Sequence, residues 1–149
     1  MGRIQAHQTM RDCNLVVMKK KYFTTVSHKV LVVDDEAEIG LLLKRILKQK
    51  FSVVEHALTL EAGLVFSQQL QPTIILLDNN LPDGSGIDRL HEFRNVCPDS
   101  CIIVISAMTH LRMQALSKGA MAFIEKPLSF DRLIQTIEQV CDENYIVHS

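Results

Sequence analysis

The sequence predicts an α/β protein in which a parallel sheet is covered by helices on both faces, in a doubly wound arrangement. Three observations support this fold class. Runs rich in Val, Ile and Leu alternate five times with segments whose apolar residues recur at helical spacing. The run at 73–77 contains no charged residue, as is typical of a strand buried inside a sheet. The chain has 149 residues and is 47% hydrophobic, enough for one domain with a substantial core.

The first two strand–helix pairs follow from local patterns. Residues 29–34 form a β-branched run that predicts a strand, and 37–49 have an apolar stripe that predicts an amphipathic helix. A weak alternation at 51–57 predicts a second, short strand. Thr59 has a side chain suited to an N-cap, so we expect the next helix to span 59–70.

Proline and glycine mark the boundaries of the later elements. Pro72 and Pro98 interrupt helices, and Gly119 is suited to the turn after one. Ser129 provides an N-cap for the last helix. The elements predicted after residue 70 are, in order, a strand at 73–77, a helix at 87–96, a strand at 101–106, a helix at 111–118, a short strand within 120–127 and a helix from 129 to about 142.

The chain divides into three parts: a flexible N-terminal extension at 1–28, one folded domain at 29–142 and a C-terminal tail at 143–149. A net charge of −1 gives no reason to expect attraction to nucleic acid or to a membrane surface. No apolar run approaches the roughly 18 residues of a membrane span, and no signal peptide is recognisable, so we expect a cytoplasmic protein. The four cysteines lack zinc-site spacing, so we expect reduced thiols.

Polar residues stand at or just after the carboxyl ends of four predicted strands. They are Asp34 and Asp35 after the first strand, Asp78 after the third, Ser106 at the end of the fourth and Lys126 after the fifth. Each residue taken alone is more often a helix cap, a turn former or a solvated loop residue. Ligands of doubly wound sheets bind beyond the carboxyl ends of the strands, however, so five such residues at that edge predict a shared site.

The residue types at this site favour phosphoryl chemistry. Three carboxylates close together repel one another, and a hard divalent cation with oxygen ligands, such as Mg²⁺, would relieve that repulsion. A carboxylate can attack a phosphoryl group and form an acyl phosphate. Lys126 would supply positive charge to the transferring group, and Ser106 would supply a hydroxyl hydrogen bond.

Four motifs together resemble the receiver domains of two-component response regulators. They are VLVVDDE at 30–36, IILLDNNLPDGSGID at 74–88, VISAM at 104–108 and FIEKP at 123–127, and the resemblance extends over about 29–142. It implies a flavodoxin-like (βα)5 fold with a five-stranded parallel sheet of order 2-1-3-4-5. It also implies a phosphoprotein in a phosphorelay, in which an aspartyl phosphate switches a protein-interaction face.

The resemblance gives the acids and one asparagine specific roles. Asp78 is the expected phosphoacceptor. Mg²⁺ is expected to bind directly to Asp35, Asp78 and the main-chain carbonyl of Asn80, and to Asp34 through water. Glu36, a third acid beside the pair, is expected to cap the first helix, because acids favour helix N-termini.

The resemblance also identifies residues that would respond to the phosphoryl group. Ser106 and Lys126 are expected to contact its oxygens, and Ser106 and Phe123 to form the switch. The alternative for Phe123 is ordinary core packing, and because it has no hydroxyl it is less informative than a Tyr at that position. The peptide bond between Lys126 and Pro127 is expected to be cis, which would direct Lys126 into the site.

A receiver of this kind would not be an enzyme in the usual sense, since it would catalyse only its own phosphorylation and dephosphorylation. Its expected partners are a sensor histidine kinase or a histidine phosphotransfer protein. A downstream protein or a second copy would bind the face formed by the fourth helix, the fifth strand and the fifth helix. No nucleic-acid-binding segment is recognisable, so the chain is either a stand-alone receiver or a fragment of a longer regulator.

Two other functions are possible from the same residues. A phosphatase of the haloacid dehalogenase type also uses an aspartate nucleophile and Mg²⁺, but its two acids are separated by one residue, whereas Asp34 and Asp35 are adjacent. A pseudo-receiver that only binds partners would lack one of the five site residues, and all five are present.

Overall fold

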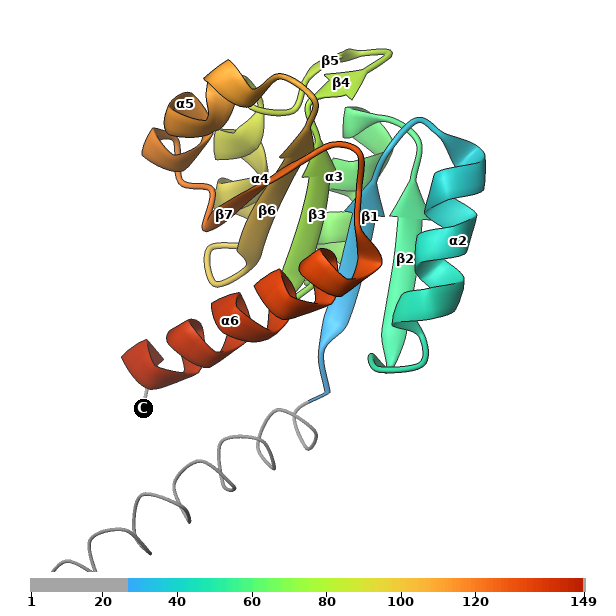
Figure 1. Ribbon diagram of the computed structural model, residues 1–149, viewed down its shortest axis with the longest axis vertical. Coiled ribbons are helices and arrows are strands. Elements are labelled where there is room, and N and C mark those ends of the chain that lie inside the picture. Colours follow the sequence, from blue (N-terminus) through green and yellow to red (C-terminus); the bar gives the residue numbers. More distant parts are fainter. Residues whose placement is uncertain (1–26, 149) are drawn as a thin grey trace, which may run out of the picture.

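The computed structural model describes residues 27–148, with side chains described up to Val140. The expected N-terminal extension lies outside the described residues except for Ser27 and His28. Five parallel strands form one sheet in the order β2-β1-β3-β6-β7, which confirms the predicted order (Figure 1). The strands are β1 (Lys29–Val33), β2 (Val53–Ala57), β3 (Ile74–Asp78), β6 (Cys101–Ser106) and β7 (Ala122–Glu125).

Helices cover both faces of the sheet, as the doubly wound prediction requires (Figure 1). One face packs against α2 (Ala37–Leu47) and α6 (Phe130–His148), and the other against α3 (Leu60–Leu70), α4 (Leu90–Val96) and α5 (Arg112–Ser117). Alternate residues of the central strands point to opposite faces, so each strand contributes to both core layers. In β1, for example, Val30 and Val32 belong to the α2 layer and Leu31 and Val33 to the opposite one.

Several helix boundaries differ from the predictions. The helix expected at 87 begins at Leu90, because the chain at 86–89 is still in turns, although Ile87 is buried and fits the helical spacing. The helix expected at 111–118 is a 3₁₀ turn at Thr109–Leu111 followed by α5. The last helix does not end near residue 142: α6 continues through the expected tail to His148. Local patterns define the buried stripe of a helix better than its ends.

Two smaller predictions are confirmed. Thr59 caps α3, since its hydroxyl accepts from the N–H of Ala62 at 3.1 Å. Gly119 follows α5 with φ of +107°, a conformation that glycine adopts without strain. No helix in the described part of the chain is long and apolar enough to span a membrane.

The segment after β3 contains a feature that the sequence did not predict. Two short strands, β4 (Asn80–Leu81) and β5 (Gly84–Ser85), pair antiparallel and form a small hairpin. The hairpin projects beyond the carboxyl edge of the main sheet (Figure 1). It therefore lies at the edge where the predicted site residues end their strands.

Candidate functional site

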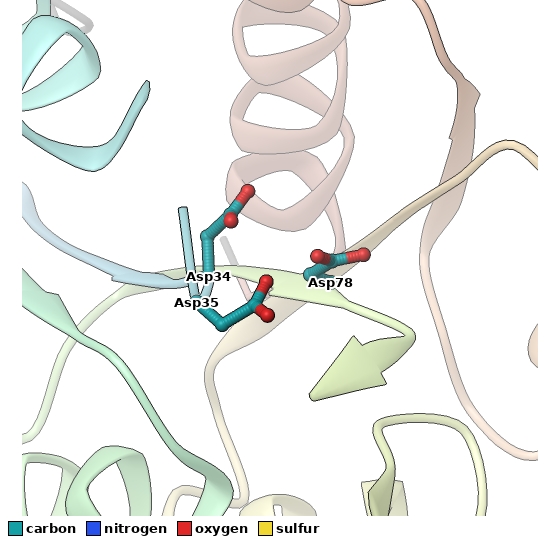
Figure 2. Close-up of side chains that lie close together, drawn as sticks. All are labelled: Asp34, Asp35 and Asp78. Carbon is teal, nitrogen blue, oxygen red and sulfur yellow. The ribbon is translucent and has the colours of Figure 1, made fainter. Parts of the chain in front are cut away.

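Three carboxylates meet at the carboxyl edge of the sheet. Asp34 and Asp35 follow β1 directly, and Asp78 is the last residue of β3. Because β1 and β3 pair in parallel register, with Val33 opposite Leu77, the residues after that pair lie side by side. One ligand oxygen from each aspartate lies within 4.8 Å of the others. Figure 2 shows the Asp35 carboxylate turned toward Asp78, with Asp34 beside them.

Asp34 is nearly buried, and its surroundings fix both its position and its charge. Its main-chain N–H donates to the carbonyl of Ala57 on β2 at 3.0 Å, and its Oδ1 accepts from the N–H of Glu36 at 2.8 Å. Burial raises the pKa of the Asp34 carboxyl, the Glu36 N–H lowers it, and the charge of Asp78 raises it again. The pKa of Asp34 therefore lies above its ordinary value, mainly because the carboxyl is buried and secondarily because Asp78 is close.

Lys126 reaches the same cluster from β7. Its main-chain N–H donates to the carbonyl of Ser106 at 3.0 Å, and the Lys126–Pro127 bond is cis, as the resemblance implied. Its Nζ donates to Asp78 Oδ2 at 3.2 Å. Burial lowers the pKa of the Lys126 ammonium, but the charge and hydrogen bond of Asp78, together with the charges of Asp34 and Glu36, leave the pKa above its ordinary value. Lys126 is therefore a full positive charge that offsets part of the cluster's negative charge.

Glu36 does not cap the first helix, so that prediction is wrong. It stands at the N-cap position of α2, but its side chain makes no capping hydrogen bond. Its Oε1 instead lies 3.8 Å from Lys126 Nζ. Glutamate is too long to be a favoured N-cap, whereas the lysine offers a full positive charge within reach. Glu36 is thus a further acid at the rim of the cluster.

Ser106 lies at the same edge, at the end of β6. It is buried, and β6 pairs with β3 so that Asp78 is opposite Ile105, one residue before Ser106. The Ser106 Oγ accepts from the main-chain N–H of Met108 at 3.0 Å. Among the hydrogen bonds of the described residues, none joins Ser106 to Asp78. A hydroxyl can donate while it accepts, so Ser106 retains a donor for another group.

The loop after Asp78 is fixed by Asn79, which the sequence analysis did not identify. Asn79 is buried, and its Oδ1 accepts from the hydroxyl of Ser85 at 2.8 Å and from the N–H of Ile87 at 3.0 Å. Its main-chain carbonyl accepts from the N–H of Gly86 at 3.0 Å. A side chain at Gly86 would collide with the main-chain oxygen of Asp78, so this close approach requires glycine. An amide residue directly after an apolar strand was the available sequence signal.

The hairpin that contains Asn80 is attached to the rest of the fold by Asp83. The N–H of Asn80 donates to Asp78 Oδ1 at 3.3 Å. The Asp83 carboxylate accepts from the N–H of Leu60 at 2.9 Å and of Glu61 at 3.0 Å, at the N-terminus of α3. An anion at a helix N-terminus is favourable, because the N–H groups there have no partner within the helix. These bonds hold the hairpin, and Asn80 with it, at a fixed place beside the acidic cluster.

Phe123, the predicted switch residue, lies on β7 with its side chain buried. The guanidinium of Arg112 lies over its ring, 5.1 Å from the centroid, and Arg112 Nη1 donates to the Phe123 carbonyl at 3.5 Å. A cation over an aromatic face is attracted by the ring quadrupole. The sequence analysis did not identify Arg112, because nothing in its local pattern indicates that α5 would place it against β7.

The donor atoms of the cluster are oxygens. Hard divalent cations such as Mg²⁺ prefer carboxylate, carbonyl and water oxygens, whereas zinc sites are usually built from thiolate and imidazole. The three aspartates therefore fit a hard cation, and the N–H of Asn80, 3.3 Å from Asp78 Oδ1, places the main chain of that residue beside the cluster. Cys97 and Cys101 are buried in the two core layers and take no part in this site.

Comparison with known proteins gives a consistent result. A family model described as "Response regulator receiver domain" matches residues 30–138. The chain is 33% identical over 115 residues to the chemotaxis protein CheY of Thermotoga maritima, a match that covers 75% of this chain and 96% of that protein. It is 32% identical over 117 residues to the chemotaxis protein CheY of Bacillus subtilis, covering 76% and 98% of the two chains.

Two solved structures extend the comparison to three dimensions. A CheY-like response regulator receiver domain protein from Methanospirillum hungatei superposes with a TM-score of 0.75 at 28% identity, over 80% of this chain and 98% of that one. The beryllofluoride-activated NtrC4 receiver domain, described as a dimer in solution, superposes with a TM-score of 0.72 at 34% identity. That match covers 78% of this chain and 98% of the other.

Proposed function

The chain belongs to the family of response regulator receiver domains, which transmit signals in two-component systems, and on this premise we propose that Asp78 is its phosphoacceptor. The observation that supports this most is the Lys126 Nζ, 3.2 Å from Asp78 Oδ2 and beside a cluster of three carboxylates. Asp78 has an ammonium group next to it that can pair with a transferred phosphoryl group. We propose 29–142 as the receiver domain, in keeping with the family match at 30–138.

In the proposed reaction a carboxylate oxygen of Asp78 attacks the phosphorus of a phosphohistidine on the donor protein. The P–N bond breaks and an acyl phosphate forms on Asp78. The donor histidine leaves as a neutral imidazole, because its other ring nitrogen already carries a proton in the phosphohistidine. Lys126 pairs with one phosphoryl oxygen, and the Ser106 hydroxyl donates to another. Hydrolysis of the acyl phosphate by water then restores the carboxylate.

We propose that Mg²⁺ is the cofactor of this transfer. Asp35, Asp78 and the main-chain carbonyl of Asn80 would hold it, and Asp34 would bind it through water. Bound there, Mg²⁺ would offset the negative charge of the carboxylates and of the phosphoryl oxygens. The pKa of Asp34 is raised chiefly by burial and further by the charge of Asp78, and a cation bound at the cluster would offset that repulsion.

The proposed donors are a sensor histidine kinase or a histidine phosphotransfer protein. The proposed output face comprises α5, β7 and α6, to which a downstream protein or a second copy would bind. Exposed apolar side chains on and beside α5 support this, namely Met108, Met113, Leu116 and Met121. We propose a cytoplasmic location for this receiver domain. With a net charge of −1, no contact with nucleic acid is proposed for this chain.

The alternative of a haloacid-dehalogenase-type phosphatase is not supported. The matching family is that of receiver domains, and the acids at 34 and 35 are adjacent rather than separated by one residue. We propose that the protein modifies only itself and does not turn over external phosphoesters.

Intact-mass analysis tests the assignment of Asp78. Wild type treated with Mg²⁺ and acetyl phosphate should gain one phosphoryl group, and Asp78→Asn should gain none. Asp99→Asn is the matched control, because Asp99 is an exposed aspartate in a turn away from the cluster. An equal mass gain in wild type and Asp78→Asn would contradict the proposal.

A further inference from the structure

His56 on β2 occupies a space beside α2 that is open only because residue 40 is glycine. The imidazole lies where a Cβ at Gly40 would be, so any side chain there would displace it. Its Nε2 lies 2.8 Å from the main-chain oxygen of Asp34. Since a carbonyl oxygen only accepts, Nε2 carries a hydrogen and donates this bond. The His56 imidazole therefore both fills the space between α2 and β2 at Gly40 and makes the hydrogen bond to Asp34.

This hydrogen bond fixes the peptide group between Asp34 and Asp35. β2 holds Asp34 at both main-chain ends, since Ala57 accepts from its N–H at 3.0 Å and His56 donates to its oxygen. A peptide group is planar, so the orientation of the Asp34 oxygen sets the direction in which the chain enters Asp35. Within the described part of the chain, the exposed Asp35 carboxylate has no hydrogen-bond or ion-pair partner. Its position is therefore set by the main chain that leads to it.

We propose that His56, in the space left by Gly40, is a positioning residue for the metal site. It keeps the Asp35 carboxylate within reach of Asp34 and Asp78, so that the oxygen donors are arranged before a cation binds. The inference rests on the proposed function, because it concerns Mg²⁺ at that cluster. His56 would touch neither the cation nor the phosphoryl group and would act only through the Asp34 oxygen.

Three substitutions separate this role from simple filling of space. His56→Gln places an amide nitrogen near the position of the imidazole Nε2, so it can still donate to the Asp34 oxygen. His56→Leu fills a similar volume but has no donor. Gly40→Ala displaces the ring by steric overlap, while alanine itself favours the helix. The inference therefore predicts that Gly40→Ala resembles His56→Leu, and that His56→Gln resembles wild type.

The measurement is a Mg²⁺ titration followed by the NMR amide shifts of Asp35 and Asp78. His56→Leu and Gly40→Ala should bind Mg²⁺ about tenfold or more weakly than wild type, in line with the loss of other partners that orient metal ligands. His56→Gln should bind within about threefold of wild type. In the metal-free protein, the Asp35 amide should exchange faster in His56→Leu than in His56→Gln. Dispersed spectra of each variant establish that it is folded.

The outcomes distinguish the inference from the proposed function. If folded His56→Leu binds Mg²⁺ as tightly as wild type, or if His56→Gln is as weak as His56→Leu, the positioning role is overturned while the metal site stands. If wild type shows no Mg²⁺-dependent shift at Asp35 and Asp78, the metal site fails and the inference fails with it.

Discussion

The guanidinium of Arg112 lies 5.1 Å from the centroid of the Phe123 ring, and Arg112 also donates to the Phe123 carbonyl at 3.5 Å. The ring is buried, with 5% of the residue's surface exposed. Arg112 is the first residue of α5, so the contact connects the proposed switch residue to one of the two helices of the proposed output face. Arg112 therefore stabilises the inward position of Phe123.

Arg112→Ala should shift Phe123 toward an outward position and make activation easier. A cation–π contact at a partly exposed site contributes about 0.5–1 kcal/mol, so beryllofluoride should bind about two- to fivefold more tightly. A beryllofluoride titration in the presence of Mg²⁺ measures this change. Arg132→Ala, which removes an exposed arginine on α6, should leave the affinity unchanged. An unchanged affinity in Arg112→Ala would show that the contact does not restrain the switch.

Ser106→Ala should still accept a phosphoryl group on Asp78, but more slowly, and should transmit it poorly. Without the hydroxyl, the end of β6 loses the side-chain donor through which phosphoryl oxygens can draw in the loop that follows. The oligomeric mass with and without beryllofluoride measures transmission. Ser100→Ala is the matched control, since Ser100 directly precedes β6 and its buried hydroxyl has no hydrogen-bond partner among the residues that the structure describes. Equal transmission by Ser106→Ala and Ser100→Ala would exclude the hydroxyl as the switch contact.

Mg²⁺ should stabilise the wild-type protein, and Asp35→Asn should not respond to it. A ligand that binds only the native state at ten times its Kd contributes about 1.4 kcal/mol to the free energy of unfolding. Thermal unfolding with Mg²⁺ and with EDTA measures the effect. Glu38→Gln removes another exposed acid, three residues further on, and should respond like wild type. A full response in Asp35→Asn would place the cation elsewhere.

Asp34→Asn should stabilise the metal-free protein at neutral pH. Burial and the neighbouring Asp78 raise the pKa of Asp34, while the Glu36 N–H lowers it less than they raise it. Because the pKa of Asp34 is higher in the native state than the 3.8 of the unfolded state, Asp34 stabilises the native protein fully only below pH 3.8. This contribution to stability is lost as the pH rises through the native pKa. The free energy of unfolding of Asp34→Asn should therefore exceed that of wild type by its full amount at pH 7, and the difference should become smaller toward pH 4. Urea unfolding in EDTA at both pH values measures it, and a gap that widens toward pH 4 would contradict the assignment.

Met113→Lys should abolish activated dimerisation or partner binding without affecting phosphorylation. Met113 on α5 is 74% exposed, so lysine is tolerated there in the monomer, whereas a charge within an apolar interface is costly. Sedimentation with beryllofluoride measures dimerisation, and intact mass measures phosphorylation. Leu41→Lys is the control, because Leu41 is 64% exposed but lies on α2, outside the proposed face. If Met113→Lys still dimerises with beryllofluoride, the interface must lie on another surface.

Local patterns were sufficient to predict a parallel sheet and the residues at its carboxyl edge, whereas the order of its strands came from the family resemblance. The apolar run before Asp78 could only be a buried strand, and a strand of a parallel sheet places its last residue at the carboxyl edge. Asp34, Ser106 and Lys126 also stand at or just after the ends of their strands. They lie near one another at the carboxyl edge because those strands belong to one sheet. The roles that the family resemblance gives to these residues remain predictions.

Two predictions were wrong because a local sequence pattern continued past the end of the helix to which it belongs. Ile87 fits the spacing of the following helix and is buried, yet it lies in a turn whose shape depends on the amide of Asn79. Glu36 is correctly placed for a cap by sequence, but Lys126, far along the chain, provides a stronger partner. In both cases a contact with a remote residue outweighed a local preference.

The sequence by itself determined the order of the elements, the buried faces of the strands and the position of acids at strand ends, because these depend on hydrophobic periodicity along a short stretch of chain. Only the tertiary structure decided which side chains support that site. His56 reaches the Asp34 oxygen because Gly40 lets α2 approach β2, and Arg112 covers Phe123 because α5 packs beside β7. Such contacts depend on the distance and orientation between a helix and a strand. Core packing determines both, and no spacing of residues in the sequence does.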